Sequence, residues 1–186
     1  RLWLVDRTEQ GARVLHRRGG VTRELEVPGV SGRDVRAFLV SRDGSRLVAL
    51  VRGDGPGGGD SVWVSRLRHD EAGRVQQATP AIRIDDLDVA PTRIRDLAWR
   101  TPTTLALLTP VDDGLFRVRG MNIDGGPGGV SALSITVRSE VQRLVGSPAP
   151  SQSLFAIGPQ VLVPLVVRTD GPLPLDAGIT ALFYSG

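Results

Sequence analysis

The sequence predicts an all-β fold, a partial β-propeller made of repeated sheets of four antiparallel strands. Short apolar runs separated by turn residues fill the chain of 186 residues, and no segment keeps a helical period, so we expect almost no helix. One hairpin pattern also recurs along the chain. A β-sandwich contains many short strands too and is the alternative fold.

The segment Val35–Gly53 carries the strongest of these signals. Two apolar runs, Val35–Val40 and Arg46–Val51, flank the turn-like tetrapeptide Ser41–Gly44. An Asp-Gly pair between such runs favours a hairpin, because glycine tolerates the positive φ that a tight turn demands.

The same hairpin pattern returns twice with other residues. Ile94–Trp99 and Thr104–Thr109 flank the proline turn Arg100–Thr103, and Val141–Val145 and Ser153–Ile157 flank Ser147–Gln152. The repeats align Leu47, Leu105 and Leu154, which lie 58 and 49 residues apart. Four short strands in about 40–50 residues is the period of propeller blades, which bury their faces by stacking on neighbours.

Further strand-like runs complete four groups. In Ser61–Arg68 the residues alternate, with Val62, Val64 and Arg66 on one face and Trp63, Ser65 and Leu67 on the other. The remaining expected strands are Arg1–Val5, Arg13–His16, Val21–Val27, Ala81–Ile84, Leu115–Ile123 (closed by Asp124–Gly126), Val130–Val137, Val161–Val167 and Gly178–Tyr184.

These groups divide the chain, as one propeller fragment over residues 1–186, into blade-like units at about 1–30, 33–85, 92–138 and 140–186. We expect about three complete four-stranded blades and one incomplete blade of three strands, which lacks its innermost or outermost strand. Because the chain begins at Arg1 rather than Met, we expect it to be the C-terminal part of a larger propeller, with any targeting segment upstream. Open propeller ends would favour self-association.

The composition limits the chemistry. All 23 basic residues are Arg, a bias typical of a high-G+C genome, and the net charge is only +3, so we infer no nucleic-acid binding. The absence of Cys excludes disulfides and thiolate metal sites. No signal peptide or membrane span is visible.

Three short motifs are better interpreted as turns than as sites. Gly53–Gly58 formally matches a dinucleotide fingerprint, but a strand follows it instead of a helix and Pro56 removes a donor. Asp85–Asp88 could supply Ca²⁺ ligands but lacks EF-hand spacing. Asp112–Gly114 is a second acidic turn.

Other candidate residues also have ordinary structural explanations. His16 and His69 lie in separate units and are expected at the surface or at strand ends. His16–Gly20 faintly resembles an RNA-binding Arg-Gly-Gly stretch, but a hairpin turn explains it. Trp3, Trp63 and Trp99 recur at strand positions, as blade-packing residues would. We therefore assign no catalytic, cofactor-binding or metal-binding residue and expect no cofactor, and the partner-binding residues stay unknown.

The succession of segments resembles the C-terminal propeller region of the lipoprotein LpqB family of actinobacteria. The similar segments are Leu2–Arg7, Val35–Gly53, Arg95–Leu108 and Thr180–Gly186, in the expected order. The family's closing segment would read Pro-x-Tyr-Pro-Gly, whereas this chain reads Ala181–Gly186.

The resemblance implies a function that the residues alone do not give. Family members carry a lipobox Cys and a GerMN domain ahead of the propeller, and they lie on the outer face of the cytoplasmic membrane. They are associated with the MtrAB two-component system and with cell-envelope homeostasis. We accordingly expect a non-enzymatic module that docks the extracellular domain of a sensor histidine kinase, with membrane contact only through an upstream anchor.

Two alternative functions belong to other classes. One is a metal-dependent propeller hydrolase or lactonase, with a metal in the central channel. The other is a cell-wall glycan binder, in which Trp3, Trp63 or Trp99 would stack on sugars.

Overall fold

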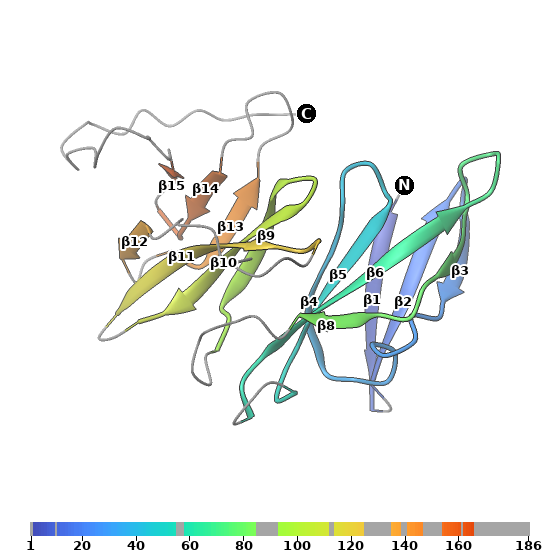
Figure 1. Ribbon diagram of the computed structural model, residues 1–186, viewed down its shortest axis with the longest axis horizontal. Coiled ribbons are helices and arrows are strands. Elements are labelled where there is room, and N and C mark those ends of the chain that lie inside the picture. Colours follow the sequence, from blue (N-terminus) through green and yellow to red (C-terminus); the bar gives the residue numbers. More distant parts are fainter. Residues whose placement is uncertain are drawn as a thin grey trace. The chain divides into compact units, whose positions relative to one another are not determined.

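The computed structural model describes residues 2–9, 11–54, 58–84, 93–111, 114–124, 135–138, 141–146, 154–160 and 162–165. The regular elements of these residues are β-strands, and no α-helix occurs among them (Figure 1). The prediction of an all-β chain is confirmed over this part of the sequence.

The strands form four sheets, and within each sheet neighbours in space are neighbours in sequence, apart from one extra strand (Figure 1). The first sheet contains β1 (Leu2–Thr8), β2 (Gly11–Arg18) and β3 (Val21–Leu25). The second contains β4 (Val35–Val40), β5 (Arg46–Val51), β6 (Ser61–His69), β7 (Val75–Ala78) and β8 (Ile82–Ile84). The third contains β9 (Asp96–Thr101), β10 (Thr104–Pro110), β11 (Leu115–Asn122) and β12 (Ile135–Arg138), and the fourth β13 (Arg143–Gly146), β14 (Leu154–Ile157) and β15 (Leu162–Leu165).

The chain divides into two compact units, each with its own hydrophobic core. The first unit holds Arg1–Ile94 with Asn122–Val130, and the second holds Arg95–Met121 with Ser131–Gly186. The assignment of the chain to a single propeller fragment, with the blade boundaries given above, stays a prediction.

In the first unit, the first and second sheets share one core. Strand β5 contributes Leu47, Ala49 and Val51 to it. Because side chains alternate along a strand, Val48 and Leu50 point to the other face of β5, and both are 0% exposed. Strand β5 is therefore buried on both faces.

Strand β6 has the predicted alternation. Trp63 and Leu67 pack in the shared core, and Val62 is buried on the opposite face. Trp63 pairs with Ala49 across the β5–β6 ladder, which places both residues on the core-facing side of the sheet.

The outer strands of the two sheets lie together. Strand β3 contacts β7, and β1 contacts β4. Both edge strands of the first sheet therefore lie against edge strands of the second.

The sequence interpretation was wrong about the end of the second sheet. We expected one strand at Ala81–Ile84, whereas two strands pair with β6: β7 with its Leu67–His69 end and β8 with Val62–Val64. Thr79 lies between them; its Oγ1 accepts a hydrogen bond from the Arg66 N–H at 3.0 Å. The edge of this sheet is thus divided into two short pieces.

The hairpin between β4 and β5 forms as predicted. The Gly44 N–H donates to the Ser41 carbonyl at 2.8 Å, and Gly44 has φ 75°. Asp43 accepts a hydrogen bond from the Ser41 hydroxyl at 2.6 Å and another from the Ser45 N–H at 3.0 Å. These bonds lower the pKa of Asp43 below its ordinary value, because they stabilise the ionised carboxylate.

In the second unit, the third and fourth sheets share a core. Ala106 and Leu108 of β10 belong to it, while Leu105 and Leu107 are buried on the other face of the strand. β10 therefore repeats the two-sided burial of β5.

A half-buried acidic residue links the two sheets of the second unit. Asp96 at the start of β9 accepts a hydrogen bond from the Leu144 N–H of β13 at 2.7 Å. Burial raises the pKa of Asp96, although this bond opposes the rise.

Strand ends differ from the sequence expectation by a few residues. Strand β1 continues to Thr8, β2 covers Gly11–Arg18, β3 stops at Leu25, and β9 begins at Asp96. The expected strand at 178–184 and the turns at 125–126 and 147–152 lie outside the described residues, as do parts of the strands expected at 130–137 and 161–167.

Glycine at position 11 is required by a close backbone approach. Gly11 has φ 108°, and a Cβ there would lie 2.2 Å from the carbonyl carbon of Gly32. The Ala12 N–H donates to the Arg33 carbonyl at 3.1 Å beside this contact. We expect Gly11→Ala to lower the free energy of unfolding by about 2–6 kcal/mol, because backbone strain and overpacking each cost about 1–3 kcal/mol.

The control for that variant is Gly20→Ala. Gly20 also has positive φ, 81°, but nothing lies within 4 Å of its added Cβ. Strain alone should cost about 1–2 kcal/mol there. Urea unfolding compares the two variants, and equal losses would contradict the close approach at Gly11.

A second prediction concerns Asp96. Asp96→Ala leaves the Leu144 N–H without its acceptor and should lower the free energy of unfolding by about 1–3 kcal/mol, whereas Asp96→Asn keeps an acceptor and should lower it less.

Because the folded state raises the pKa of Asp96, the ionised carboxylate opposes folding. Relative to Asp96→Asn, the native chain should therefore lose stability as pH rises from about 4 to 7. Urea unfolding at both pH values measures this, and a gain of relative stability with pH would contradict it.

Candidate functional site

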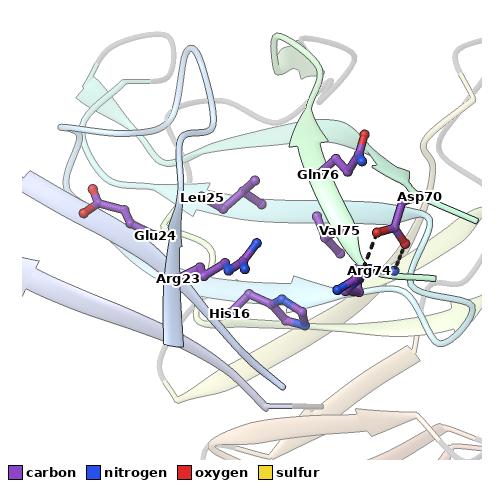
Figure 2. A pocket seen from close by; sticks show the side chains of 8 residues that line it. All are labelled: His16, Arg23, Glu24, Leu25, Asp70, Arg74, Val75 and Gln76. Carbon is purple, nitrogen blue, oxygen red and sulfur yellow. Dashed lines mark hydrogen bonds and ion pairs between the residues drawn. The ribbon is translucent and has the colours of Figure 1, made fainter. Parts of the chain in front are cut away.

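A cavity of about 590 Å³ lies in the first unit between β3 and the hairpin of β6 and β7 (Figure 2). We call it the β3–β7 groove. It is lined by His16, Arg23, Glu24, Leu25, Asp70, Arg74, Val75 and Gln76. Its volume is within the range of sites that bind small molecules or a few residues of a peptide.

One wall of the groove is the turn between β6 and β7. The Arg74 N–H donates to Asp70 Oδ1 at 2.7 Å, and the Arg74 guanidinium donates to Asp70 Oδ2 at 2.9 Å (Figure 2). The backbone bond from Arg74 lowers the pKa of Asp70. Gly73, with φ 67°, donates its N–H to the Asp70 carbonyl at 2.9 Å. The turn is therefore closed by its own residues, and the charge of Arg74 is already paired.

Arg18 ties this turn to the first sheet. Its Nη1 donates to the Gly73 carbonyl at 2.8 Å and to the Ala72 carbonyl at 3.2 Å. A guanidinium can bind two carbonyls at once because its donors form a planar fork. The two walls of the groove are thus held together by one side chain of β2.

The floor of the groove is apolar. Leu25 and Val75 lie at its centre (Figure 2), and Leu25 is 8% exposed. His16 borders them and is also 8% exposed, with its ring centre 4.5 Å from that of Trp3. The expectation that His16 lies at the surface or at a strand end was wrong, since it faces the core from the interior of β2.

Of the charged side chains on β3 that line the groove, Glu24 lies near an opposite charge and Arg23 does not pair with one among the described residues. Glu24 lies 3.7 Å from Arg13, which also pairs with Asp6 at 2.6 Å. Among the described residues Arg23 makes no ion pair, and its side chain extends into the groove (Figure 2). Register places Arg23 opposite His16, so both lie on the same face of the first sheet.

A second polar cluster surrounds Asp54, after the end of β5. Asp54 Oδ2 accepts hydrogen bonds from the Trp63 indole at 3.0 Å and from the Ser61 hydroxyl at 3.1 Å. Arg33 pairs with Asp54 and lies over the Trp63 ring, 4.5 Å from its centre. Each member is satisfied by another, so this cluster anchors Asp54 rather than presenting free groups.

The other residues that the sequence singled out are not brought together. Gly53 and Gly58 have positive φ, at 69° and 79°, in open space. Residues 55–57, 85–88 and 112–113 lie outside the described residues. His69 ends β6, as expected for a strand-end residue.

The three tryptophans lie at strand positions, as the sequence predicts. Trp3 and Trp63 pack against the core of the first unit. Trp99 belongs to β9, where its carbonyl lies against Gly146 of β13, since a Cβ at Gly146 would be 1.9 Å from that oxygen.

Sequence reasoning missed the groove. The signal for its wall was present in Asp70–Arg74, where an aspartate and a glycine follow an alternating strand, as in a tight turn. Arg23 could not be singled out among 23 arginines, because its position beside β7 depends on tertiary structure.

The described residues lack two further features. They contain no group of three or more His, Cys, Asp or Glu arranged to hold a metal ion. They also contain no helix with the length and apolar character needed to cross a membrane.

The fold and the groove define a propeller-like module of stacked antiparallel sheets. A family model described as "Lipoprotein LpqB beta-propeller domain" matches residues 1–150. The chain therefore belongs to this family of β-propeller domains, as the succession of hairpins predicted. The match supports the propeller over the sandwich.

A curated relative shows the same similarity. Lipoprotein LpqB of Thermobifida fusca (strain YX) is 30% identical over 125 residues, which are 67% of this chain and 18% of the relative. The matched region thus spans less than a fifth of the relative's length.

The clamp formed by Arg18 leads to a prediction. Arg18→Ala should release the turn, because both carbonyls lose their donor. We expect the amides of residues 71–75 to exchange hydrogen about tenfold faster, which corresponds to about 1.4 kcal/mol of local opening energy. Arg17→Ala, at the neighbouring position on the other face of β2, is the control. Unchanged exchange in Arg18→Ala would show that the turn does not depend on this clamp.

Proposed function

We propose that this chain is a non-catalytic protein-interaction module of a lipoprotein. In this proposal it engages the extracellular domain of a sensor histidine kinase and modulates a two-component system of the MtrAB type, with effects on envelope homeostasis. The protein acts outside the cytoplasm, attached to the outer face of the cytoplasmic membrane by an upstream lipid anchor.

The observation that carries the proposal is the family match over residues 1–150. The relative is named a lipoprotein, and a lipid-anchored protein is held at the membrane surface, where it can meet the extracellular part of a membrane kinase.

The described side chains support a binding role over a catalytic one. Asp54, Asp60 and Asp96 are engaged by backbone or side-chain donors within the fold. Asp60 is 7% exposed and accepts the Ile94 N–H at 2.8 Å, so it serves as a structural acceptor. Rigid sheets that carry short connections at their edges are a common support for binding surfaces.

Two of the three tryptophans proposed for glycan binding, Trp3 and Trp63, are covered by other side chains of the fold. Trp3 packs against His16 and Phe38, with ring-centre distances of 4.5 and 6.1 Å. Trp63 is covered by Arg33. A ring that stacks on sugars needs an open face.

Binding to the kinase tests the proposal. The 186-residue chain is passed over the immobilised extracellular domain of the cognate sensor kinase, and an unrelated kinase's extracellular domain is the control. We expect saturable binding with a Kd of about 1–100 μM, as is common for transient signalling contacts. Equal signals on the two domains, or none on the cognate domain, would contradict the proposed function.

A further inference from the structure

We propose that the β3–β7 groove docks an extended segment of a protein partner that carries an acidic and an aliphatic side chain two residues apart, with Arg23 pairing the carboxylate. This inference rests on the proposed function, since it names the surface through which the module would hold its partner.

Two sheet edges border the groove. β3 is the last strand of the first sheet, and β7 ends the main path of the second. Edge strands carry backbone donors and acceptors on a side that no neighbour uses, and extended peptides pair with such edges.

The two edges are not equivalent. The β6–β7 ladder shifts register between Arg68 and His69, so Gln76 lies in a bulge, and bulges interrupt strand addition. β3 pairs with β2 in unbroken register over its whole length, and four of its five residues are exposed. We therefore assign the backbone pairing to β3 and the side-chain contacts to the β7 wall.

The lining defines the chemistry of the occupant. Leu25 and Val75 offer an apolar floor, which suits aliphatic side chains that point inward. Arg74 is neutralised by Asp70 at 2.9 Å, and Glu24 lies near Arg13. The charge left for a ligand is the guanidinium of Arg23, which binds carboxylates through two parallel hydrogen bonds. A segment with an acidic and an aliphatic residue two positions apart fits both features, because Arg23 and Leu25 lie on one face of β3 and residues i and i+2 of a paired strand share a face.

The walls are fixed before a ligand arrives. Arg18 holds the β6–β7 turn against the first sheet, with its Nη1 2.8 Å from the Gly73 carbonyl. A preformed groove avoids part of the ordering cost of binding.

The test uses Arg23→Glu and Arg23→Gln in the 186-residue chain, with Arg17→Glu as the matched control. Arg17 lies on the same strand pair but pairs with Thr22, on the face away from the groove, and it is exposed. Arg17→Glu makes the same charge change as Arg23→Glu. Since both positions are exposed, each variant should unfold at the same urea concentration as the native chain.

Three probes are titrated onto each variant. They are the cognate kinase's extracellular domain, a labelled seven-residue peptide with the sequence Thr-Glu-Thr-Val-Thr-Glu-Thr, and the same peptide with Lys in place of each Glu. We expect Arg23→Glu to weaken the binding of the kinase domain and of the acidic peptide at least tenfold, and Arg23→Gln to weaken it less. The affinity of Arg17→Glu for both probes should stay within about twofold of that of the native chain. The Lys peptide should not bind the native chain.

The outcomes separate this inference from the proposed function. If the kinase domain binds and Arg23→Glu does not weaken this binding, the inference that the groove docks the partner is wrong and the proposed function stands. If the acidic peptide binds through Arg23 but the kinase domain does not bind, the inference that the groove docks an acidic segment stands and the proposed function is wrong. Displacement of the peptide by 10 mM inorganic phosphate would reduce the site to an anion site and overturn the docking proposal. Loss of peptide binding together with dimer formation in sedimentation would mean that a second copy occupies the groove, and would overturn it as well.

Discussion

Strand β5 places Leu47, Ala49 and Val51 in the core of the first unit, and Val48 and Leu50 are equally buried on its other face. β10 does the same in the second unit. A strand covered on both faces cannot carry polar side chains on either, so the sequence must supply an uninterrupted apolar run. Most polar and functional groups therefore lie at strand ends, on outer strands and in connections, with the buried His16 of β2 and Ser65 of β6 as exceptions, and the placement of the polar contacts follows from this constraint.

The polar contacts of the fold occupy these positions. Asp96 joins β9 to β13, Arg18 joins β2 to the turn after β6, and Asp54 pairs with Arg33 from the segment before β4. Each connects segments that are distant in sequence and satisfies groups that the stacking of apolar faces would leave unpaired. The β3–β7 groove remains open because both of its borders are outer strands, where the apolar cover of the central strands ends.

The sequence predicted the parts that depend on local pattern. The hairpin Val35–Val51 combines two apolar runs with an Asp-Gly turn, and the faces of Ser61–Arg68 follow from strict alternation. Strand β7 was missed because Val75–Ala78 holds two glutamines and stays on an outer edge, where burial imposes no apolar pattern. The groove could not be predicted from the sequence because β3 and β7 are far apart along the chain. Their contact arises only when the two sheets stack.

Hydrogen exchange resolved by strand tests this account most directly. Amides of β5 and β10 lie in strands buried on both faces and should open only with the whole unit, whereas β3, with four exposed residues, should exchange through local opening. We expect protection in β5 and β10 to exceed that in β3 by at least about a hundredfold. Protection in β3 equal to that in β5, under conditions where the chain is monomeric, would contradict two-sided burial as the basis of the fold.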